Sequence, residues 1–255
     1  MRICIAGNMP TFVSDKLIEY KHLLMLQSYF DYRSGGAKVL EQFKTIYDAS
    51  HFFILDSGAF SFMNQGIKDI DWFDYTKKYA QLINKFEIKN FIELDIDSIV
   101  GIKKVEELRD FLYKETGVQP IPVWHKERGL KYWEKMIKEY DFVAIGASGT
   151  NDAMWTRTKE GTLALNKLVY QAKQHNCKVH GLGYTSLKNI DSIGWYSVDS
   201  TSWLSAVKYP TGLHIFQNGK LIKYPQPKGT HSNHKKTWIH QLTEWNKLQN
   251  YYLTK

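Results

Sequence analysis

Short apolar runs recur along the chain, and stretches with apolar residues three or four positions apart separate them. Several runs are continuously apolar, which is typical of strands that are covered on both faces. The runs predict strands at Arg2–Ala6, His51–Leu55, Asn90–Leu94, Gln119–Trp124, Asp141–Ile145, Lys178–Leu182, Trp195–Val198 and Gly212–Phe216. The spaced stretches predict helices at Asp71–Phe86, Val105–Glu115, Leu130–Glu139 and Thr162–His175, the last capped by Gly161-Thr162.

Eight strands that alternate with helices predict an α/β protein built as a single (β/α)8 TIM barrel. The chain has 255 residues, so each strand-and-helix unit has about 32 residues, near the lower limit for that fold. A doubly wound open sheet is the alternative. Two segments fit the repeat poorly. Thr11–Ser50 is predicted to hold one or two helices around a Ser34-Gly35-Gly36 break, and Leu213–Tyr224 resembles a hairpin around Asn218-Gly219.

The composition changes near residue 228. Residues 1–227 carry the repeat and are predicted to form the barrel domain, without a zinc-binding subdomain. Residues 228–255 begin polar and basic, and a helical stripe of large apolar residues follows: Trp238, Leu242, Trp245, Leu248 and Tyr252. We expect this C-terminal helix to pack on the barrel, and a partner-binding helix is the alternative.

Aspartates stand where apolar strands run out into loops: Asp56 in FFILDSGAF, Asp95 and Asp97 in NFIELDIDS, and Asp199 in WYSVDSTSW. Burying a carboxylate is unfavourable, so this repeated placement indicates a function. The carboxyl ends of barrel strands meet at one mouth, where we expect these side chains to face one ligand. The alternative for Asp56 and Asp199 is a structural role as helix N-caps. Alternation puts Glu93, Asp95 and Asp97 on one strand face, where they require hydrogen-bond donors, a ligand or a divalent metal.

Small residues and histidines end the other strands. Gly146 and Ala147 in AIGASG leave space for a flat ligand against the backbone, and so does Gly181 beside His180 in HGLGY. His125 follows another strand, where a structural role is favoured. The chain lacks the G-x-G-x-x-G and P-loop spacings, so we expect no nucleotide cofactor.

The net charge of +8 favours a polyanionic partner, although a lysine-rich surface alone would give the same charge. Lys235 and Lys236 in the tail are candidate nucleic-acid contacts. No apolar run approaches the roughly 20 residues of a membrane span, and the first residues lack the pattern of a signal peptide. Cys4 and Cys177 are expected to pack as small apolar residues and are too few for structural zinc. We therefore expect a cytoplasmic protein without a metal.

Taken in order, the strand ends resemble the motifs of the tRNA-guanine transglycosylase superfamily, including its shorter relatives of phages and modification islands that insert 7-deazaguanines into DNA. DSGAF is similar to the family's Asp-Ser-Gly-Gly-Phe motif at Asp56, ELDID to its second aspartate strand at Asp95, and AIGASG to its base-binding glycine strand at Gly146. KVHGLG resembles its His-x-x-Gly-x-Gly strand at His180, and SVDSTSW resembles its nucleophile motif at Asp199. The resemblance spans residues 50–205.

The resemblance implies a (β/α)8 barrel that exchanges guanine in a nucleic acid for a 7-deazaguanine base. It implies that Asp199 is the nucleophile, that Asp56 is the general acid and base, and that Asp95 and the Gly146 backbone bind the guanine edge. The remaining substrate-binding residues that it implies are Ser57, Gly58, Ala147, His180 and Gly181. The exchange requires no redox cofactor and no ATP.

Two features depart from the family pattern. Ala59 stands where the first motif has its second glycine, and the Cys-x-Cys-x-x-Cys zinc cluster is absent from the sequence. That cluster belongs to a subdomain that helps to position tRNA, so its absence favours DNA over tRNA as the substrate. Two other functions stay open. One is a metal-dependent barrel hydrolase that uses Asp56, Asp95, Asp97 and His125, and the other is a catalytically inactive nucleic-acid-binding barrel.

Overall fold

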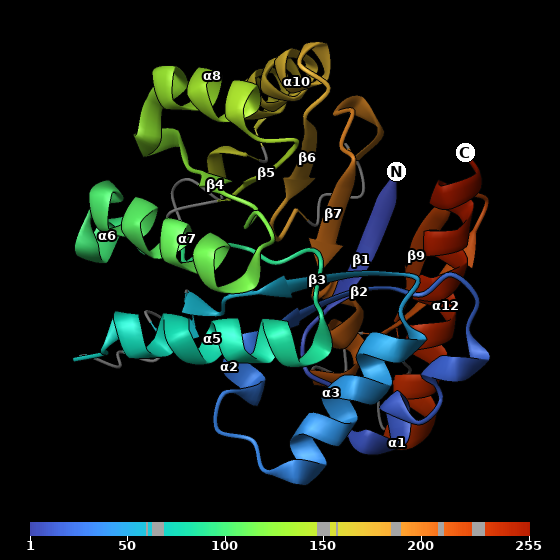
Figure 1. The fold of residues 1–255 in the computed structure, drawn as a ribbon. Helices are drawn as coiled ribbons and strands as arrows, with labels where there is room; N and C mark the ends of the chain where they lie inside the picture. Colours follow the sequence, from blue (N-terminus) through green and yellow to red (C-terminus); the bar gives the residue numbers. More distant parts are fainter. Residues whose placement is uncertain are drawn as a thin grey trace.

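The structure is a computed structural model that describes residues 1–59, 61–62, 69–146, 154–156, 158–184, 190–208, 212–225 and 233–255. It has a mixed α/β fold around a curled, parallel, seven-stranded sheet with the order β3-β2-β1-β7-β6-β5-β4 (Figure 1). The strands are β1 (Arg2–Ala6), β2 (Leu24–Ser28), β3 (Phe52–Asp56), β4 (Val123–Trp124), β5 (Phe142–Ile145), β6 (Lys178–Gly181) and β7 (Ser197–Ser200). The predicted α/β class is confirmed. Of the predicted eight-stranded barrel, the structure shows a curled parallel sheet of seven strands.

A short extended segment lies between the two edge strands, β3 and β4. Leu55 of β3 pairs in parallel with Phe91, and Ile92 pairs in parallel with Ile121 just before β4. The Ile92 amide donates to the Leu55 carbonyl at 2.9 Å, and the Ile121 amide donates to the Phe91 carbonyl at 2.8 Å. The predicted strand Asn90–Leu94 is therefore present as two isolated bridges and not as a full strand.

One strand of the sheet was not predicted. β2 lies inside Thr11–Ser50, where only helices were expected, and it pairs in parallel with β1 and β3. Its sequence, LMLQS, is rich in residues that favour helices. The prediction was wrong because burial between two neighbouring strands outweighs the weak local preference of such a short run.

The predicted strand Gly212–Phe216 does not belong to the main sheet. β8 (Leu213–Gln217) pairs only with the antiparallel β9 (Lys220–Tyr224), in a separate two-stranded sheet. The turn residues Asn218 and Gly219 both have positive φ, as a tight hairpin turn requires. The hairpin prediction for this segment is confirmed, and its use as a barrel strand was wrong.

Helices cover the outer face of the curled sheet (Figure 1). They are α1 (Thr11–Ser14), α2 (Tyr29–Tyr32), α3 (Ala37–Ala49), α5 (Trp72–Phe86), α6 (Asp97–Val100), α7 (Ile102–Thr116), α8 (Gly129–Glu139), α10 (Lys159–Gln174), α11 (Ser205–Lys208) and α12 (His234–Thr254). The four predicted helices correspond to α5, α7, α8 and α10. Asp71 caps α5 by accepting from two backbone amides. Thr158, and not the predicted Gly161-Thr162, caps α10.

The C-terminal helix α12 packs against the sheet, as expected. All five residues of its predicted apolar stripe are buried. The buried Gln249 donates to the carbonyls of Ile3 and Leu24 at 2.9 and 2.6 Å, which fixes the second half of α12 near the amino ends of β1 and β2. No helix within the described ranges is long and apolar enough to span a bilayer.

The inner face of the sheet holds a compact apolar layer. Its buried residues are Cys4, Ala6, Leu24, Leu26, Ile54, Ile92, Ile121, Val123 and Ala144. These residues alternate along their strands with larger ones that face the helices. The inner layer ends toward the carboxyl end of the sheet, where polar residues replace apolar ones.

Candidate active site

The carboxyl end of the sheet gathers the predicted aspartates. Asp56 is the last residue of β3, and Asp199 is the third residue of β7. The two carboxyl groups influence each other electrostatically, because the Asp199 charge is one cause of the raised pKa of Asp56. Asp56 likewise raises the pKa of Asp95. Asp56, Asp95 and Asp199 therefore share one site, although Asp56 and Asp199 are 143 positions apart in the sequence.

The Asp199 carboxylate is held through one of its two oxygens. Oδ1 accepts from the Gly183 amide at 2.7 Å and hydrogen-bonds with His180 Nε2 at 3.3 Å. The other imidazole nitrogen of His180 hydrogen-bonds with the Ser197 hydroxyl at 2.8 Å. Asp199 is only 6 % exposed, and within the described part of the chain its Oδ2 accepts no hydrogen bond. The arrangement orients the carboxylate through Oδ1.

His180 is fully buried on β6. Both of its ring nitrogens are engaged, one with Ser197 and one with Asp199. A ligand therefore has no free imidazole nitrogen to bind. His180, which was predicted to bind substrate, supports Asp199 in the structure. Its partner Ser197 was not among the predicted site residues.

Asp56 is held by the turn that follows β3. Its Oδ2 accepts from the Gly58 amide at 3.0 Å. Burial is the main cause that raises the pKa of Asp56 to about 6, and the Asp199 charge adds to it. A carboxyl group with that pKa exchanges protons readily near neutral pH.

Gly58 is the residue that makes this turn possible. Its φ is +73°, and a β-carbon at this position would meet the Phe30 and Ser28 side chains at 2.5 Å. Ser57, beside it, is fully buried, and its carbonyl accepts from the Tyr75 hydroxyl at 2.5 Å. The DSGA turn is therefore fixed from both sides, and Ser57 is closed to a ligand in this structure.

Asp95 lies next to His125 in the site. Asp95 Oδ2 is 3.7 Å from His125 Nε2. Burial raises the pKa of Asp95 well above its usual range, and the charges of Asp56 and Glu93 act in the same direction. Burial also lowers the pKa of His125. The pair therefore favours a neutral carboxyl group beside a neutral imidazole.

Gly146, at the end of β5, packs against His125. A β-carbon at Gly146 would lie 2.9 Å from His125 Cε1 and 3.0 Å from Val123 Cγ1. His125 Nδ1 is buried and has no hydrogen-bond partner within the described residues. Gly181 is packed against the Trp195 ring in a similar way. The predicted site residue Ala147 lies outside the described residues.

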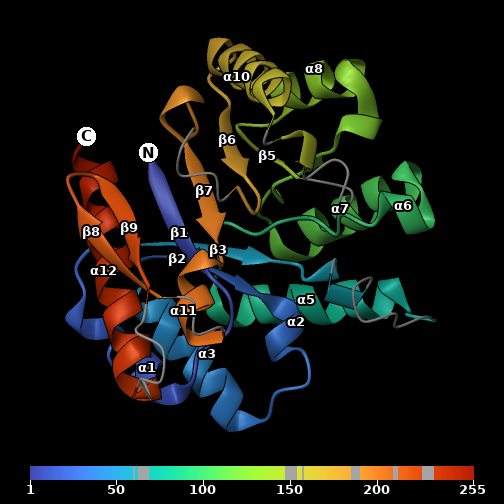
Figure 2. The same cartoon turned by 180° about the vertical axis from the view of Figure 1, so that it is seen from behind.

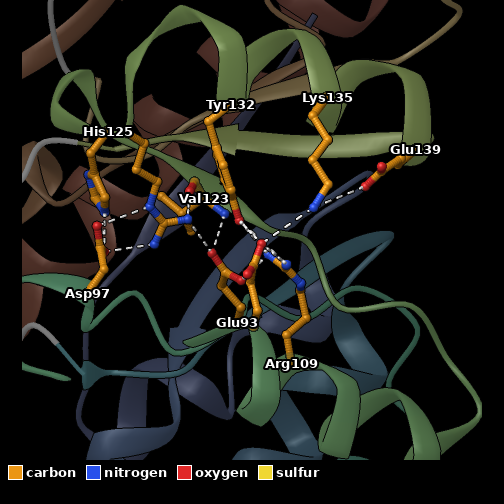
Figure 3. A network of polar contacts seen from close by, with 10 residues as sticks. Glu93, Asp97, Arg109, Val123, His125, Tyr132, Lys135 and Glu139 are labelled. Carbon is orange, nitrogen blue, oxygen red and sulfur yellow. Dashed lines mark hydrogen bonds and ion pairs between the residues drawn. The ribbon is translucent and has the colours of Figure 1, made fainter. Parts of the chain in front are cut away.

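The other acids of the ELDID segment belong to a buried ion network (Figure 3). Glu93 accepts from Arg109 at 2.8 Å, from Arg128 at 2.9 Å and from the Val123 amide at 2.8 Å. Arg128 also donates to both oxygens of Asp97, at 2.7 and 3.1 Å. Burial alone would raise the pKa of Asp97, but its hydrogen bonds with Arg128 outweigh burial and lower it. Of the partners that the sequence required for these acids, the structure supplies hydrogen-bond donors, chiefly two arginines.

Arg109 and Arg128 were not among the residues predicted for the site. Arg109 occupies the apolar stripe of α7, between the buried residues Val105, Leu108 and Leu112. A cation on the buried face of a helix is a signal that a buried acid lies opposite. Arg128 had no comparable local signal, because it sits in a one-turn 3-10 helix (Lys126–Arg128).

Lys235 and Lys236 stand in the first turn of α12. Trp238, at the start of the next turn, packs on Trp203, whose indole nitrogen donates to the Ala6 carbonyl at 2.7 Å. Ala6 is the last residue of β1, so α12 begins near the carboxyl end of the sheet (Figure 2). The two lysines lie at the same end of the molecule as the aspartates.

The described residues contain no group of three or more side chains with the placement of metal ligands. Asp97 was a candidate ligand, and both of its oxygens are engaged by Arg128. No protein-family model matches this sequence, and no curated protein matches it.

Proposed function

We propose that this protein is a guanine transglycosylase-like enzyme. It exchanges guanine in a nucleic acid, with DNA favoured over tRNA, for a 7-deazaguanine base. The observation that carries the proposal is the Asp199 carboxylate, held by Gly183 and His180 through one oxygen and within electrostatic reach of Asp56. We also propose that the segment Asn90–Leu94 serves as the eighth strand, between β3 and β4, which would make the fold a closed (β/α)8 barrel.

In the first step, Asp199 Oδ2 forms a bond to C1′ of the target nucleotide. The bond between C1′ and the base nitrogen breaks, and its electron pair leaves with guanine, which takes a proton from the Asp56 carboxyl group. In the second step, the incoming 7-deazaguanine returns a proton to the Asp56 carboxylate, and its nitrogen displaces Asp199 from C1′. Two inversions give net retention at the sugar carbon.

The neighbouring residues supply recognition in this proposal. A neutral Asp95 carboxyl group donates one hydrogen bond and accepts another, which suits the polar edge of guanine. Gly146 carries no side chain, so the β5 end packs directly on His125, and in this proposal the Gly146 backbone contacts the edge of the base. The target nucleotide must leave the base stack to reach these groups.

Basic residues near the carboxyl end would hold the phosphates. Lys235 and Lys236 lie at that end of the molecule, and the net charge is +8. Buried free cysteines at Cys4 and Cys177 fit the expected cytoplasmic location, where a phage-encoded enzyme would meet host nucleic acid. Among the rival functions, a hydrolase that needs Asp97 as a metal ligand is disfavoured, because Arg128 holds both Asp97 oxygens.

The proposal is tested by incubating the protein with labelled guanine and with separate DNA and tRNA pools, followed by nucleoside mass spectrometry. Label in one pool and a covalent protein–nucleic acid adduct on a denaturing gel are expected. Metal-dependent release of a product without label would favour the hydrolase. Tight nucleic-acid binding with neither label nor adduct would favour the inactive barrel.

A further inference from the structure

A groove opens on the outer face of β4, between the start of α8 and α10. Its volume is about 360 Å³, near the lower end of the range for small-molecule sites, which is roughly 300–1,000 Å³. Its lining includes Trp124, Lys126, Leu130, Trp155, Lys167 and Gln171. In the part of the chain that the structure describes, this lining carries two lysines and no carboxylate. The groove is therefore apolar with a positive rim.

Trp155 is held in place by the start of α10. Its carbonyl accepts from the Thr158 amide at 2.9 Å and from the Thr158 hydroxyl at 2.8 Å. Gly161 packs so closely on the same carbonyl that a β-carbon there would overlap it. The backbone that carries the indole is thus fixed before any ligand arrives.

Lys126 is fixed from the opposite side. Its ammonium lies 4.5 Å from the centre of the Trp155 ring. It belongs to the same one-turn helix as Arg128, which the buried Glu93 and Asp97 anchor. An aromatic ring with an adjacent cation is the combination that binds a base together with its phosphate.

The groove adjoins the candidate active site. The Gly146 amide donates to the Trp124 carbonyl at 2.9 Å. Trp124 lines the groove, and the next residue, His125, packs on Gly146 inside the site. Leu130, which lines the groove, is 62 % exposed, so the groove presents apolar surface to solvent.

We propose that this groove binds an unpaired base next to the target nucleotide, stacked on Trp155, with Lys126 and Lys167 neutralising the adjoining phosphate. This inference rests on the proposed function, and it gives the enzyme a site that reads the sequence context of its substrate. Two lysines without a carboxylate favour an anionic partner over a neutral one, and the Trp155 indole that lines the same groove favours a base with its phosphate over an acidic side chain. Flipping one base out of a duplex also disturbs its neighbours, which makes an unpaired flanking base available.

The test uses single-stranded DNA oligonucleotides with one guanine and with 2-aminopurine at successive flanking positions. Quenching of the 2-aminopurine fluorescence is expected at one flank only. Trp155→Ala should remove the quenching and weaken binding about 5- to 100-fold, because a base–aromatic stack is lost. Trp155→Phe should retain most of the affinity. The matched control is Tyr113→Ala, an exposed aromatic on α7 outside the groove, which should bind like the wild type.

A second variant protects the test against misfolding. Lys126→Met combined with Lys167→Met keeps the indole, and it should bind several-fold more weakly with a shallower dependence on salt. Affinities of all variants within about twofold of the wild type would overturn the inference. So would a Trp155-dependent dimer without any effect on oligonucleotide binding, because the groove would then bind a second copy of the chain.

Exchange of labelled guanine, measured in parallel, separates this inference from the proposed function. If oligonucleotide binding depends on Trp155 but the wild type exchanges no guanine, the groove is a binding site and the transglycosylase assignment is wrong. If Trp155→Ala exchanges guanine with an unchanged KM and an unchanged context preference, the transglycosylase assignment holds and the groove does not bind the flanking base.

Discussion

Acidic side chains occupy two different environments at the carboxyl end of the sheet. Glu93 and Asp97 meet arginines at 2.7 to 2.9 Å. Asp56, Asp95 and Asp199 form no ion pair with lysine or arginine among the described residues, although they lie close enough to influence one another. Two of these groups, Glu93 and Asp95, are separated by a single residue.

The difference separates acids that pair with arginine from acids that have no lysine or arginine partner among the described residues. Arginine lowers the pKa of Asp97, whereas burial and neighbouring acids raise the pKa values of Asp56 and Asp95. A cluster of buried carboxyl groups without cations destabilises the folded chain. Such a cluster is a candidate functional site, because perturbed carboxyl groups concentrate where chemistry is done.

The largest effect is expected for Asp199→Asn. Asn keeps the size and most hydrogen bonds of Asp199, but it cannot form the glycosyl ester. Base exchange should fall by at least about a thousandfold, and the adduct on a denaturing gel should disappear. Melting temperature and oligonucleotide affinity, measured as controls, should stay near wild type. If Asp199 were only a cap, Asn would replace it well and exchange would persist.

Arg128→Met tests the opposite environment. Removing the cation leaves the buried Glu93 with Arg109 alone and the partly buried Asp97 without its arginine, which should lower the free energy of unfolding by about 3–5 kcal/mol. Urea denaturation measures the loss. The control is Lys104→Met, which breaks the exposed pair with Glu107 and should change the stability by less than about 1 kcal/mol. Equal effects of the two variants would contradict the distinction between buried and exposed pairs.

Asp56→Asn should stabilise the protein at high pH. The pKa of Asp56 is about 6 in the folded chain against a usual 3.8. Between these values the folded state binds more protons than the unfolded state, so the contribution of Asp56 to stability falls as the pH rises through about 6. At pH 8 we expect a gain on the order of 2 kcal/mol from the substitution.

Thermal or urea unfolding of Asp56→Asn and wild type at pH 4 and pH 8 measures this effect. The gain should shrink to a small fraction near pH 4, where Asp56 is protonated in the folded state and about two-fifths protonated in the unfolded state. A substitution that destabilises the protein equally at both pH values would mean that Asp56 is a structural cap. Exchange activity should fall in the same variant, because proton transfer is lost.

The smallest effect is expected for the two lysines in the first turn of α12. In the proposed function, cations outside the acidic cluster hold the phosphates of the nucleic acid. Changing both Lys235 and Lys236 to Gln should weaken binding a few-fold and reduce the slope of log affinity against log salt by about 2. A matched control is Lys138→Gln with Lys114→Gln, near the ends of α8 and α7. An unchanged slope would place the nucleic acid elsewhere.

Local patterns in the sequence were sufficient for several features. The four main helices and the C-terminal stripe follow from apolar spacing, and the Asn218-Gly219 hairpin follows from turn chemistry. Both signals act within a few residues, so they survive in any tertiary context. The placement of Asp56 and Asp199 together followed from one rule, namely that parallel strands present their carboxyl ends at one side.

Only the tertiary structure decided which groups pair. β2 could not be read from LMLQS, because its strand conformation depends on lying between β1 and β3. The arginine partners of Glu93 and the Ser197–His180–Asp199 chain join side chains from different elements. Hydrogen bonds and ion pairs act over a few ångströms, and the sequence distance between their partners carries no information about that separation. The sequence by itself therefore determined which acids stand at strand ends, and packing determined which of them pair with arginine.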